Sequence, residues 1–420
     1  MCQSPGDSRR LLDLAASIST ATTKMDAYLK ERNLPYPSFE PNAPQTLPRE
    51  LQDAKDSILD AASELHDLLT DPLTAFFESA PVGFMSLMLI QRFGIADLFG
   101  PEKEMSFALI AEKTGLSEGV VKNTIRHAMT MRVFREPRKG FVGHTPRSMA
   151  MRDGDMARFM EFAMEELTPG VLSAAKACEK WPQSGEPNHT GFSLSQNTDL
   201  SLYETLAKDP VRAARMANAM HVWATSGSYP ASRVVNEYDW GRLGAGTVVD
   251  VGGSRGHVAV AIASRFPSLK FMVQDLPSTI AGAEADLPPQ LADRVSFMAH
   301  NFFQEQPVVA SAYFFRWIFH NWSDNYCIKI LRALIPALRP GALLIVNEIC
   351  MPEPGEIPVW RERLARTMTL GMISMFNSYE RDLDDWTRLF QKADPRFQFV
   401  DIQHITGTEM ALIEVKWTGE

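Results

Sequence analysis

The stretch VVDVGGSRGH, residues 248–257, decides the fold of this chain. A run of apolar residues, broken only by Asp250, leads into Gly252, Gly253 and Gly256, and a second apolar stretch follows. This order predicts a buried strand, a tight turn and a helix. Glycines suit such a turn because they adopt positive φ and let the backbone approach a ligand closely.

Two further strands are predicted directly after this unit. The first covers residues 269–273 and leads to Asp275 and Leu276, which places a carboxylate at a strand tip. An acid in that position can bind the two hydroxyls of a ribose. The next strand covers residues 294–297 and ends near Asn301 and Phe302.

The spacing of the glycines restricts the ligand. A nicotinamide dinucleotide fingerprint is G-x-G-x-x-G, which the order Gly252, Gly253, Gly256 does not match. The loop also lacks the GK[ST] of a phosphate-binding P-loop. An acid just before the loop favours a ligand with a positive end, and S-adenosylmethionine, with its ammonium, sulfonium and ribose, fits that requirement.

A second motif, RWIFHNWSD at residues 316–324, supplies a candidate base. It follows the apolar run 312–315, so His320 is expected where a fourth strand leaves the sheet, the edge at which open α/β sheets bind ligands. A neutral imidazole suits proton transfer near neutral pH. Glu348, after a strand predicted at 342–346, and Glu380, before a helix predicted at 383–390, are alternative partners to orient the ring.

Magnitudes limit what such a base does. Complete transfer of a proton from a phenol of pKa about 10 to an imidazole of pKa about 6.5 is uphill by roughly 5 kcal/mol. His320 is therefore expected to remove the proton while the oxygen attacks a methyl carbon. That help is worth about 10²–10⁴ in rate, and alignment of the reactants contributes up to roughly 7–11 kcal/mol.

The region 248–416 resembles the plant and fungal S-adenosylmethionine-dependent O-methyltransferases that act on phenolic and polyketide-like natural products. The shared motifs are VVDVGGSRGH, VQDLP, HNFF, FFRWIFHNWSD, LLIVNEIC and SYERDLDDWTRLF. The resemblance implies a Rossmann-like class I methyltransferase sheet at the C-terminus, and a helical, winged-helix dimerisation domain at the N-terminus. It also implies His320 as base with Glu348 and Glu380 beside it, and a cofactor site formed by Asp250, Gly252, Gly253, Gly256, Asp275, Leu276, Asn301, Phe302 and Arg316.

The chain departs from the family pattern at two positions. Asn301 and Asn321 stand where the family usually has aspartate. The carbonyl of Asn301 can still accept a hydrogen bond from adenine. The missing charge at Asn321, next to His320, is expected to lower the basicity of the ring.

The length of 420 residues suits two or three domains. We expect a helical arm and linker at 1–75, a winged-helix-like dimerisation domain at 76–150, a helical substrate-pocket segment at 151–238, and the catalytic domain at 239–420. Helices are predicted in the arm at 9–31 and 49–70. The resemblance implies a homodimer formed through the N-terminal domain.

Residues 106–134 predict two helices around a turn at Gly115, and the segment from Phe141 suits a wing. The pattern is that of a winged helix-turn-helix, which raises a DNA-binding hypothesis. The second helix and the turn after it carry the basic residues Lys122, Arg126, His127 and Arg132, but also Glu118.

Two methionine-rich helices, at 155–181 and 203–224, are predicted ahead of the catalytic domain. Methionine adapts to irregular apolar partners, and the resemblance places these helices over the acceptor pocket. Candidate wall residues are Met216, Met220, Trp223, Met372 and Met375. His144, in the wing segment, is a weaker candidate that more often has a structural role.

Composition narrows the remaining classes. The net charge of −9 offers nothing to nucleic acid or to an anionic membrane. The four cysteines lack C-x-x-C spacing, so neither a zinc site nor a disulfide framework is indicated, and no metal is expected. The N-terminus lacks an apolar core long enough for a signal peptide, and no early apolar run would span a bilayer. We expect a soluble cytoplasmic protein.

Three functions fit these patterns. The leading one is methylation of a hydroxyl on an aromatic, alkaloid or polyketide-like metabolite. The second is a pericyclase or cyclase that keeps the fold and the sulfonium without transferring the methyl, as some fungal relatives do. The third is a cofactor-sensing regulator that binds DNA. Retention of His320 with both glutamates favours methylation.

Overall fold

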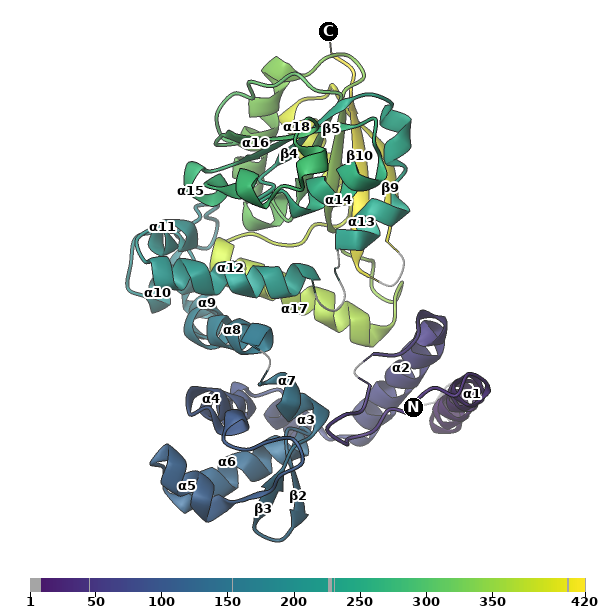
Figure 1. The fold of residues 1–420 in the computed structure, drawn as a ribbon, viewed down its shortest axis with the longest axis vertical. Helices are drawn as coiled ribbons and strands as arrows, with labels where there is room; N and C mark the ends of the chain where they lie inside the picture. Colours follow the sequence, from purple (N-terminus) through teal and green to yellow (C-terminus); the bar gives the residue numbers. More distant parts are fainter. Residues whose placement is uncertain are drawn as a thin grey trace, which may run out of the picture. The chain divides into compact units, whose positions relative to one another are not determined.

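The computed structural model describes residues 9–44, 46–152, 154–225, 229, 231–405 and 408–419, with side chains of residues 223–225 excepted. The chain forms two compact units (Figure 1). Unit 1 consists of Met1–Met164, Arg215–Ala219 and Pro358–Trp360, and unit 2 of Glu165–Ala214, Met220–Ile357 and Arg361–Glu420.

Unit 1 is mainly helical. Its helices are α1 (Arg10–Glu31), α2 (Gln52–Leu69), α3 (Pro72–Glu78), α4 (Phe84–Arg92), α5 (Phe107–Thr114), α6 (Glu118–Thr130), α7 (Pro146–Ala150) and α8 (Gly154–Phe162). A small antiparallel sheet has the order β1-β3-β2, formed by β1 (Met105–Ser106), β2 (Arg135–Arg138) and β3 (Phe141–Gly143). Within the described residues no single helix is long and apolar enough to cross a membrane; the bent pair Pro72–Glu78 and Pro81–Arg92 meets that test only when taken together.

The helix-turn-helix of unit 1 follows from its capping residues. The Ser106 hydroxyl accepts from Leu109 N at 3.2 Å and begins α5, and Gly115, at φ +71°, ends it. Ser117 begins α6 in the same way. A hairpin of β2 and β3 then follows, and it begins at Arg135, ahead of Phe141, where the sequence predicted the wing to start.

Unit 2 is built on a seven-stranded sheet in the order β6-β5-β4-β7-β8-β10-β9. Five strands run parallel, and β10 is antiparallel to β8 and to β9. The strands are β4 (Thr247–Val251), β5 (Lys270–Asp275), β6 (Val295–Ala299), β7 (Ala312–Arg316), β8 (Leu343–Ile349), β9 (Phe397–His404) and β10 (Met410–Trp417). The chain order reverses between β4 and β7, the position at which such sheets bind ligands.

Helices cover both faces of this sheet, which gives three layers (Figure 1). One core joins the sheet to α16 (Asp324–Leu334) and α18 (Leu383–Ala393), and the other joins it to α13 (Ala231–Glu237) and α14 (His257–Arg265). The remaining helices are α9 (Thr168–Lys180), α10 (Gly191–Ser195), α11 (Leu202–Leu206), α12 (Pro210–Thr225), α15 (Pro277–Ile280) and α17 (Val359–Phe376). The predicted α/β class is therefore confirmed.

Three predicted boundaries were wrong. The helix expected at 155–181 is interrupted by a π-helical turn at Ala163–Leu167. The helix expected at 203–224 is two helices, because Pro210 lacks an N–H and suits the first position of α12. Strand β8 continues to Ile349, paired with β10, so Glu348 lies inside a strand and not after one.

Candidate active site

The sheet register brings the two sequence motifs to one edge of unit 2. Val251 pairs with Phe315 across β4 and β7, and Arg316 pairs with Asn347 across β7 and β8. The glycine loop, residues 252–256, leaves the sheet beside the segment that carries His320. A Cβ on Gly252 would lie 2.4 Å from Ile318 Cδ1, so the loop and that segment are in close contact.

The conformation of the glycine loop requires its glycines. Gly252 and Gly256 have φ of +72° and +76°, which side chains disfavour. The N–H groups of Gly252 and Gly253 donate to Gln274 O at 2.8 and 3.1 Å. A Cβ on Gly253 would meet the carboxyl group of Asp250 at 2.5 Å, so this position has no room for one.

Asp275 is the last residue of β5, as predicted. Its Oδ2 accepts from Ser254 N at 2.9 Å and its Oδ1 from Leu276 N at 2.7 Å. The carboxylate thus ties the glycine loop to the end of the next strand. Each oxygen keeps a further lone pair, so these bonds leave it able to accept from a ligand hydroxyl.

Asp250 is the most unusual charge at this edge. Its side chain is buried, and its Oδ2 has no hydrogen-bond partner within the described part of the chain. Burial, together with the nearby charge of Asp275, raises its pKa to about 7, although Arg316 acts in the opposite direction. A buried carboxylate oxygen without a partner favours a cationic ligand.

Arg316 lies beside Asp250. Its guanidinium donates to the side chain of Asn347 and to Tyr229 O, the latter at 2.7 Å. Burial lowers the pKa of Arg316 to about 10, and the charge of Asp250 partly offsets that effect. Asn347 and Tyr229 were not among the predicted site residues; the signal in the sequence was the single amide in the otherwise apolar strand before Glu348.

Asn301 and Phe302 occupy the loop after β6. Asn301 is exposed, and its Oδ1 accepts from Phe303 N at 3.0 Å. Its carbonyl, which was expected to serve adenine, thus already has one backbone partner. The ring of Phe302 approaches the glycine loop, since a Cβ on Gly252 would lie 3.9 Å from Phe302 Cε1.

His320 forms a buried pair with Glu380. Its Nδ1 lies 2.8 Å from Glu380 Oε1, which confirms the predicted contact with one of the two glutamates. Its Nε2 forms no hydrogen bond with the residues that the structure describes, and the side chain is 11% exposed. Burial lowers the pKa of His320, but the charge and hydrogen bond of Glu380 and the charge of Glu348 outweigh it, so the pKa is raised above its usual 6.5.

Glu348 does not contact the ring of His320 but binds the backbone that carries it. Its Oε1 accepts from Ile318 N and Phe319 N at 2.8 and 2.5 Å, and its Oε2 accepts from His320 N at 3.0 Å. We name residues 317–322 the His320 turn. The carboxylate thus satisfies three consecutive N–H groups of this turn, which contains the 3-10 helix η9 (Phe319–Asn321).

The side chain of Asn321 also binds the backbone of the His320 turn. Its Nδ2 donates to Trp317 O at 3.0 Å. The charge beside His320 is supplied by Glu380, and the pKa of His320 is raised because Glu380 and Glu348 outweigh the effect of burial.

The predicted acceptor-wall residues differ in their surroundings. Met375 is buried, and a Cβ on Gly170 would lie 2.9 Å from its Sδ. Met372 is partly buried, Met216 is buried and Met220 is exposed. The Trp223 side chain lies outside the described residues.

His144 belongs to the core of unit 1. Its Nδ1 contacts Ser148 Oγ at 3.0 Å and its Nε2 contacts Phe99 O at 3.1 Å. Both ring nitrogens are therefore occupied within unit 1.

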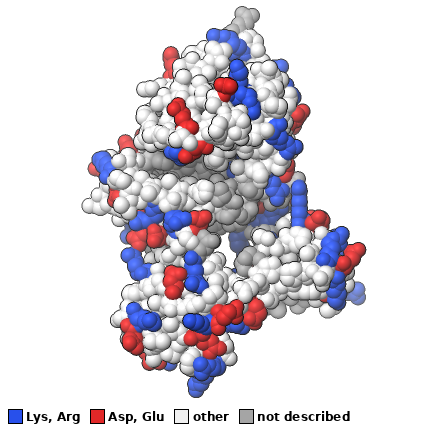
Figure 2. All heavy atoms as spheres, in the orientation of Figure 1, with Lys and Arg blue, Asp and Glu red and all other residues white. Residues whose placement is uncertain are grey.

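Two of the basic residues of helix α6, Arg126 and His127, also have partners within unit 1. Arg126 makes two bonds to Glu136, at 2.8 and 2.9 Å, and His127 Nδ1 contacts Ser86 Oγ at 2.9 Å. On the face drawn in Figure 2, basic and acidic side chains are interspersed. These contacts leave less positive charge for nucleic acid.

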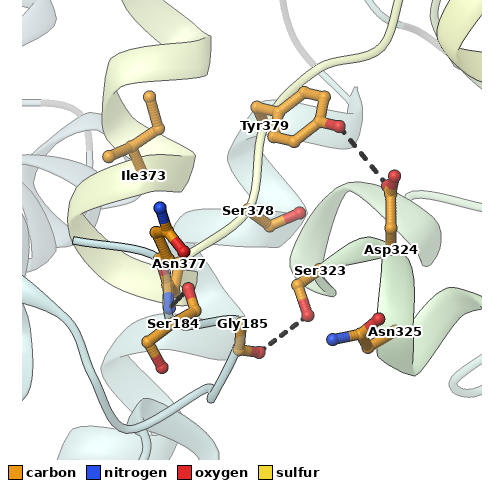
Figure 3. Close-up of a pocket in the computed structure, with 10 residues that line it drawn as sticks. Ser184, Gly185, Ser323, Asp324, Asn325, Ile373, Asn377, Ser378 and Tyr379 are labelled. Carbon is orange, nitrogen blue, oxygen red and sulfur yellow. Dashed lines mark hydrogen bonds between the residues drawn. The ribbon is translucent and has the colours of Figure 1, made fainter. Parts of the chain in front are cut away.

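A polar pocket of about 310 Å³ lies beside the His320 turn (Figure 3). Its lining is Gln183, Ser184, Gly185, Ser323, Asp324, Asn325, Ile373, Asn377, Ser378 and Tyr379. Neither His320 nor the glycine loop lines it. The pocket is therefore separate from the edge where the predicted site residues meet.

Comparison with known proteins agrees with this geometry. An O-methyltransferase domain model matches residues 186–395. O-methyltransferase PaMT of Phomopsis amygdali is 38% identical over 97% of this chain and 96% of its own length. Chlorophenol O-methyltransferase of Trichoderma longibrachiatum is 37% identical, covering 97% and 90%.

Two solved structures share the fold. OxaC in complex with sinefungin and meleagrin superposes with a TM-score of 0.76 at 22% identity, covering 98% of this chain and 100% of OxaC. A structure described as a pericyclic reaction enzyme gives a TM-score of 0.72 at 19% identity, covering 96% and 100%.

The sheet order and the glycine loop define a class I S-adenosylmethionine-dependent methyltransferase. The relatives place the chain more narrowly: it belongs to the O-methyltransferase family, it is an O-methyltransferase, and S-adenosylmethionine is its cofactor. The edge fits this cofactor, because an unpartnered buried carboxylate oxygen at Asp250 suits its ammonium and a loop without side chains admits it closely.

The contacts of the two glutamates predict different effects on stability. In Glu348→Gln an amide N–H₂ replaces one acceptor, so at least one buried N–H of the His320 turn loses its partner, at a cost of about 1–3 kcal/mol. Glu380→Gln retains Oε1 for His320 and changes only Oε2, which has no partner among the described residues. We expect thermal unfolding to show a clearly lower Tm for Glu348→Gln than for Glu380→Gln. Equal losses would contradict the assignment of Glu348 to the backbone.

Proposed function

We propose that this enzyme methylates a hydroxyl group on an aromatic, alkaloid or polyketide-like secondary metabolite, with His320 as general base. The observation that carries the proposal is the His320–Glu380 pair, in which Nδ1 is bound and Nε2 is not bound by any described residue. A neutral ring that donates its Nδ1 proton to a carboxylate has Nε2 as its acceptor. Nε2 is then the atom that receives the hydroxyl proton.

S-adenosylmethionine, when bound, supplies a methyl group on a positively charged sulfur. His320 Nε2 takes the proton of the acceptor hydroxyl as that oxygen bonds to the methyl carbon, and the electrons of the broken C–S bond remain on sulfur. The raised pKa of His320 narrows the roughly 5 kcal/mol gap between imidazole and phenol. Glu380 therefore both orients the ring and strengthens it as a base.

The cofactor would be held at the edge described above. Asp250 is suited to its ammonium, the glycine loop of Gly252, Gly253 and Gly256 to its amino-acid end, and Asp275 with Leu276 to its ribose. Asn301, Phe302 and Arg316 would line the far side. These assignments are supported by the unpartnered Asp250 Oδ2 and by the contacts among the loop, Asp275 and Phe302.

The acceptor class is supported by the names of the relatives. One is a chlorophenol O-methyltransferase and another belongs to a grayanic acid biosynthesis cluster. Of the predicted wall residues, the four that belong to unit 2, Met220, Trp223, Met372 and Met375, are proposed to shape the acceptor pocket. Phenols are accordingly the first acceptors to test.

A pericyclase or cyclase is the second candidate. It is favoured by the fold shared with a pericyclic reaction enzyme, at 19% identity. A non-transferring enzyme has no need of a base aimed at the methyl group, and the His320–Glu380 pair therefore favours transfer. Incubation with methyl-labelled S-adenosylmethionine separates the two: label in the product supports transfer, and conversion without label supports the cyclase.

We predict that His320→Ala reduces methyl transfer at least a hundredfold, in line with the value of about 10²–10⁴ for general-base catalysis. Cofactor affinity should stay nearly unchanged, because the ring does not contact the glycine loop residues proposed to hold it. Labelled transfer to phenols and calorimetry with S-adenosylhomocysteine measure the two effects. His404→Ala, on exposed β9, is the control and should retain full turnover. Unchanged turnover in His320→Ala would refute the assignment of His320 as the general base.

We predict that cofactor affinity depends on the ionisation of Asp250. Because its pKa is raised to about 7, the carboxylate that pairs with a cation is formed only as pH rises through that value. Affinity for S-adenosylhomocysteine should fall by about tenfold per pH unit below 7 and level off above it. Asp250→Asn should bind weakly and without this slope, whereas Asp275→Asn should keep the slope but with its midpoint at lower pH, because the charge of Asp275 contributes to the raised pKa of Asp250. A flat profile in the unmodified enzyme would contradict the role of Asp250.

We also propose a homodimer formed through unit 1. Unit 1 exposes large apolar side chains on and after α3, among them Phe76 at 69% and Phe77 at 67% exposure. Sedimentation velocity of the full chain should show a dimer, and Phe76→Glu with Phe77→Glu should convert it to a monomer. Leu172→Glu alters an exposed apolar residue of unit 2 and should leave the dimer intact. A monomeric unmodified chain at tens of micromolar would refute the proposal.

A further inference from the structure

The backbone of the His320 turn is irregular and must be held from outside. Trp317 has φ +57°, in the left-handed region that non-glycine residues rarely adopt. The helix η9 that follows contains only three residues. Such conformations persist only where the surrounding structure fixes them.

The N–H side of the turn is fixed by Glu348, as described above. Its carbonyl side is fixed by Arg381, whose side chain is fully buried. The guanidinium donates to Phe319 O at 3.1 Å and to Trp322 O at 2.9 Å. These two carbonyls flank His320 on either side. A buried anion and a buried cation thus bind opposite sides of one short turn.

The segment around Arg381 is attached to the same turn at further points. Ser378 Oγ donates to Trp322 O at 2.7 Å. Tyr379 OH and Arg381 both donate to Asp324 Oδ1, at 3.4 and 2.9 Å, and Figure 3 shows the Tyr379 hydroxyl directed at that carboxylate. Glu380 lies between Tyr379 and Arg381 in the sequence. The contacts of its neighbours therefore determine where its carboxylate meets His320.

The chemistry of this contact favours placement over simple stabilisation. A fully buried guanidinium is costly to desolvate, and apolar replacements of buried ion pairs often leave stability unchanged or improved. Here the planar guanidinium of Arg381 donates to two backbone carbonyls and a carboxylate at once, which the compact ammonium group of a lysine cannot do. The arrangement is thus suited to fixing one position of the turn.

We propose that Arg381 is a positioning residue of the methyl transfer: it holds the His320 turn and the Glu380 carboxylate in register, so that Nε2 stays aimed at the acceptor hydroxyl. The proposal rests on the proposed role of His320 as general base. The contacts described for the Arg381 guanidinium are the two carbonyls, Asp324, Cys327 and the rings of Tyr379 and Trp386, so it acts on His320 through the turn and not through the ring.

The test is Arg381→Lys, which keeps the charge and removes the fork. We expect kcat for transfer to a weakly acidic phenol to fall at least tenfold, with the acceptor KM and the affinity for S-adenosylhomocysteine within about twofold. Arg294→Lys is the matched control, because Arg294 also donates to three backbone carbonyls, those of Ala263, Phe266 and Leu269. It should lower Tm to a similar degree and leave kcat within about twofold. A kcat of Arg381→Lys within twofold of the unmodified enzyme overturns the proposal, as does an equal loss in Arg294→Lys.

Acceptor acidity separates positioning from general loss of structure. A polychlorinated phenol is already largely ionised at the assay pH and does not need the base. The defect of Arg381→Lys should shrink with that acceptor if Arg381 acts through His320. An equal defect with weakly and strongly acidic phenols overturns the proposal.

The dependence of kcat on pH, measured for the unmodified enzyme and for Arg381→Lys, is a further test. The charged groups that face His320 are Glu348 from β8 and Glu380 and Arg381 from the loop before α18. Arg381→Lys keeps the positive charge but should let the Glu380 carboxylate move away from His320. The pKa of His320 would then fall, and the acid limb of the kcat profile would move to lower pH. Where turnover with phenols is too slow, NMR titration of ¹⁵N-labelled His320 in the complex with S-adenosylhomocysteine reports the same shift. An unmoved limb or titration overturns the proposal.

His320→Ala, measured alongside, distinguishes the two failures. If His320→Ala retains turnover, the general base itself is refuted. If His320→Ala loses turnover and Arg381→Lys does not, the base stands and only the role of Arg381 is refuted.

Discussion

The position of the His320 imidazole, the proposed base, depends on one buried carboxylate, that of Glu348. Glu348 accepts hydrogen bonds from three consecutive N–H groups, those of residues 318–320, which leave strand β7 and so lose the pairing that the sheet provides. The pairing of Arg316 with Asn347 across β7 and β8 sets Glu348 beside those groups. The register of the parallel strands β7 and β8 thus determines where His320, the proposed base, lies.

Burial acts on both sides of this edge, with different results. At Asp250 burial, together with the charge of Asp275, raises the pKa to about 7, and Oδ2 has no partner among the described residues. At His320 burial alone would lower the pKa, but the pair with Glu380 reverses the direction. Glu380 is thus paired with the proposed base His320, whereas Asp250 keeps a carboxylate oxygen that the ammonium group of the cofactor could bind.

Much of the cofactor edge could be predicted from the sequence, because its signals are local. The strand at 247–251, the turn at Gly252 and the acid at the end of β5 each follow from a few adjacent residues. The contact between His320 and a glutamate was also predicted. What could not be predicted is which glutamate makes it, because that depends on the register of β8 against β7. Glu348 looked like a free residue after a strand and is in fact a strand residue bound to backbone.

The roles missed in the sequence are those that depend on residues distant along the chain. Arg381 follows Glu380 directly, but its contacts with Phe319 and Trp322 follow only from the docking of the loop before α18. The π-helical turn at 163–167 has no local signal comparable to Pro210 at the start of α12.

Asn321 shows the same limit most clearly. Adjacency to His320 suggested that an aspartate was needed there for its charge, yet the side chain donates to Trp317 O. An ionised aspartate has no proton to donate, so it could not make this bond to the residue held at φ +57°. In this chain the Asn321 amide binds the unusual backbone before His320, and the carboxylate beside the His320 ring is that of Glu380. An asparagine at position 321 is thus consistent with the raised pKa of His320, because Asn321 holds the backbone and Glu380 supplies the negative charge.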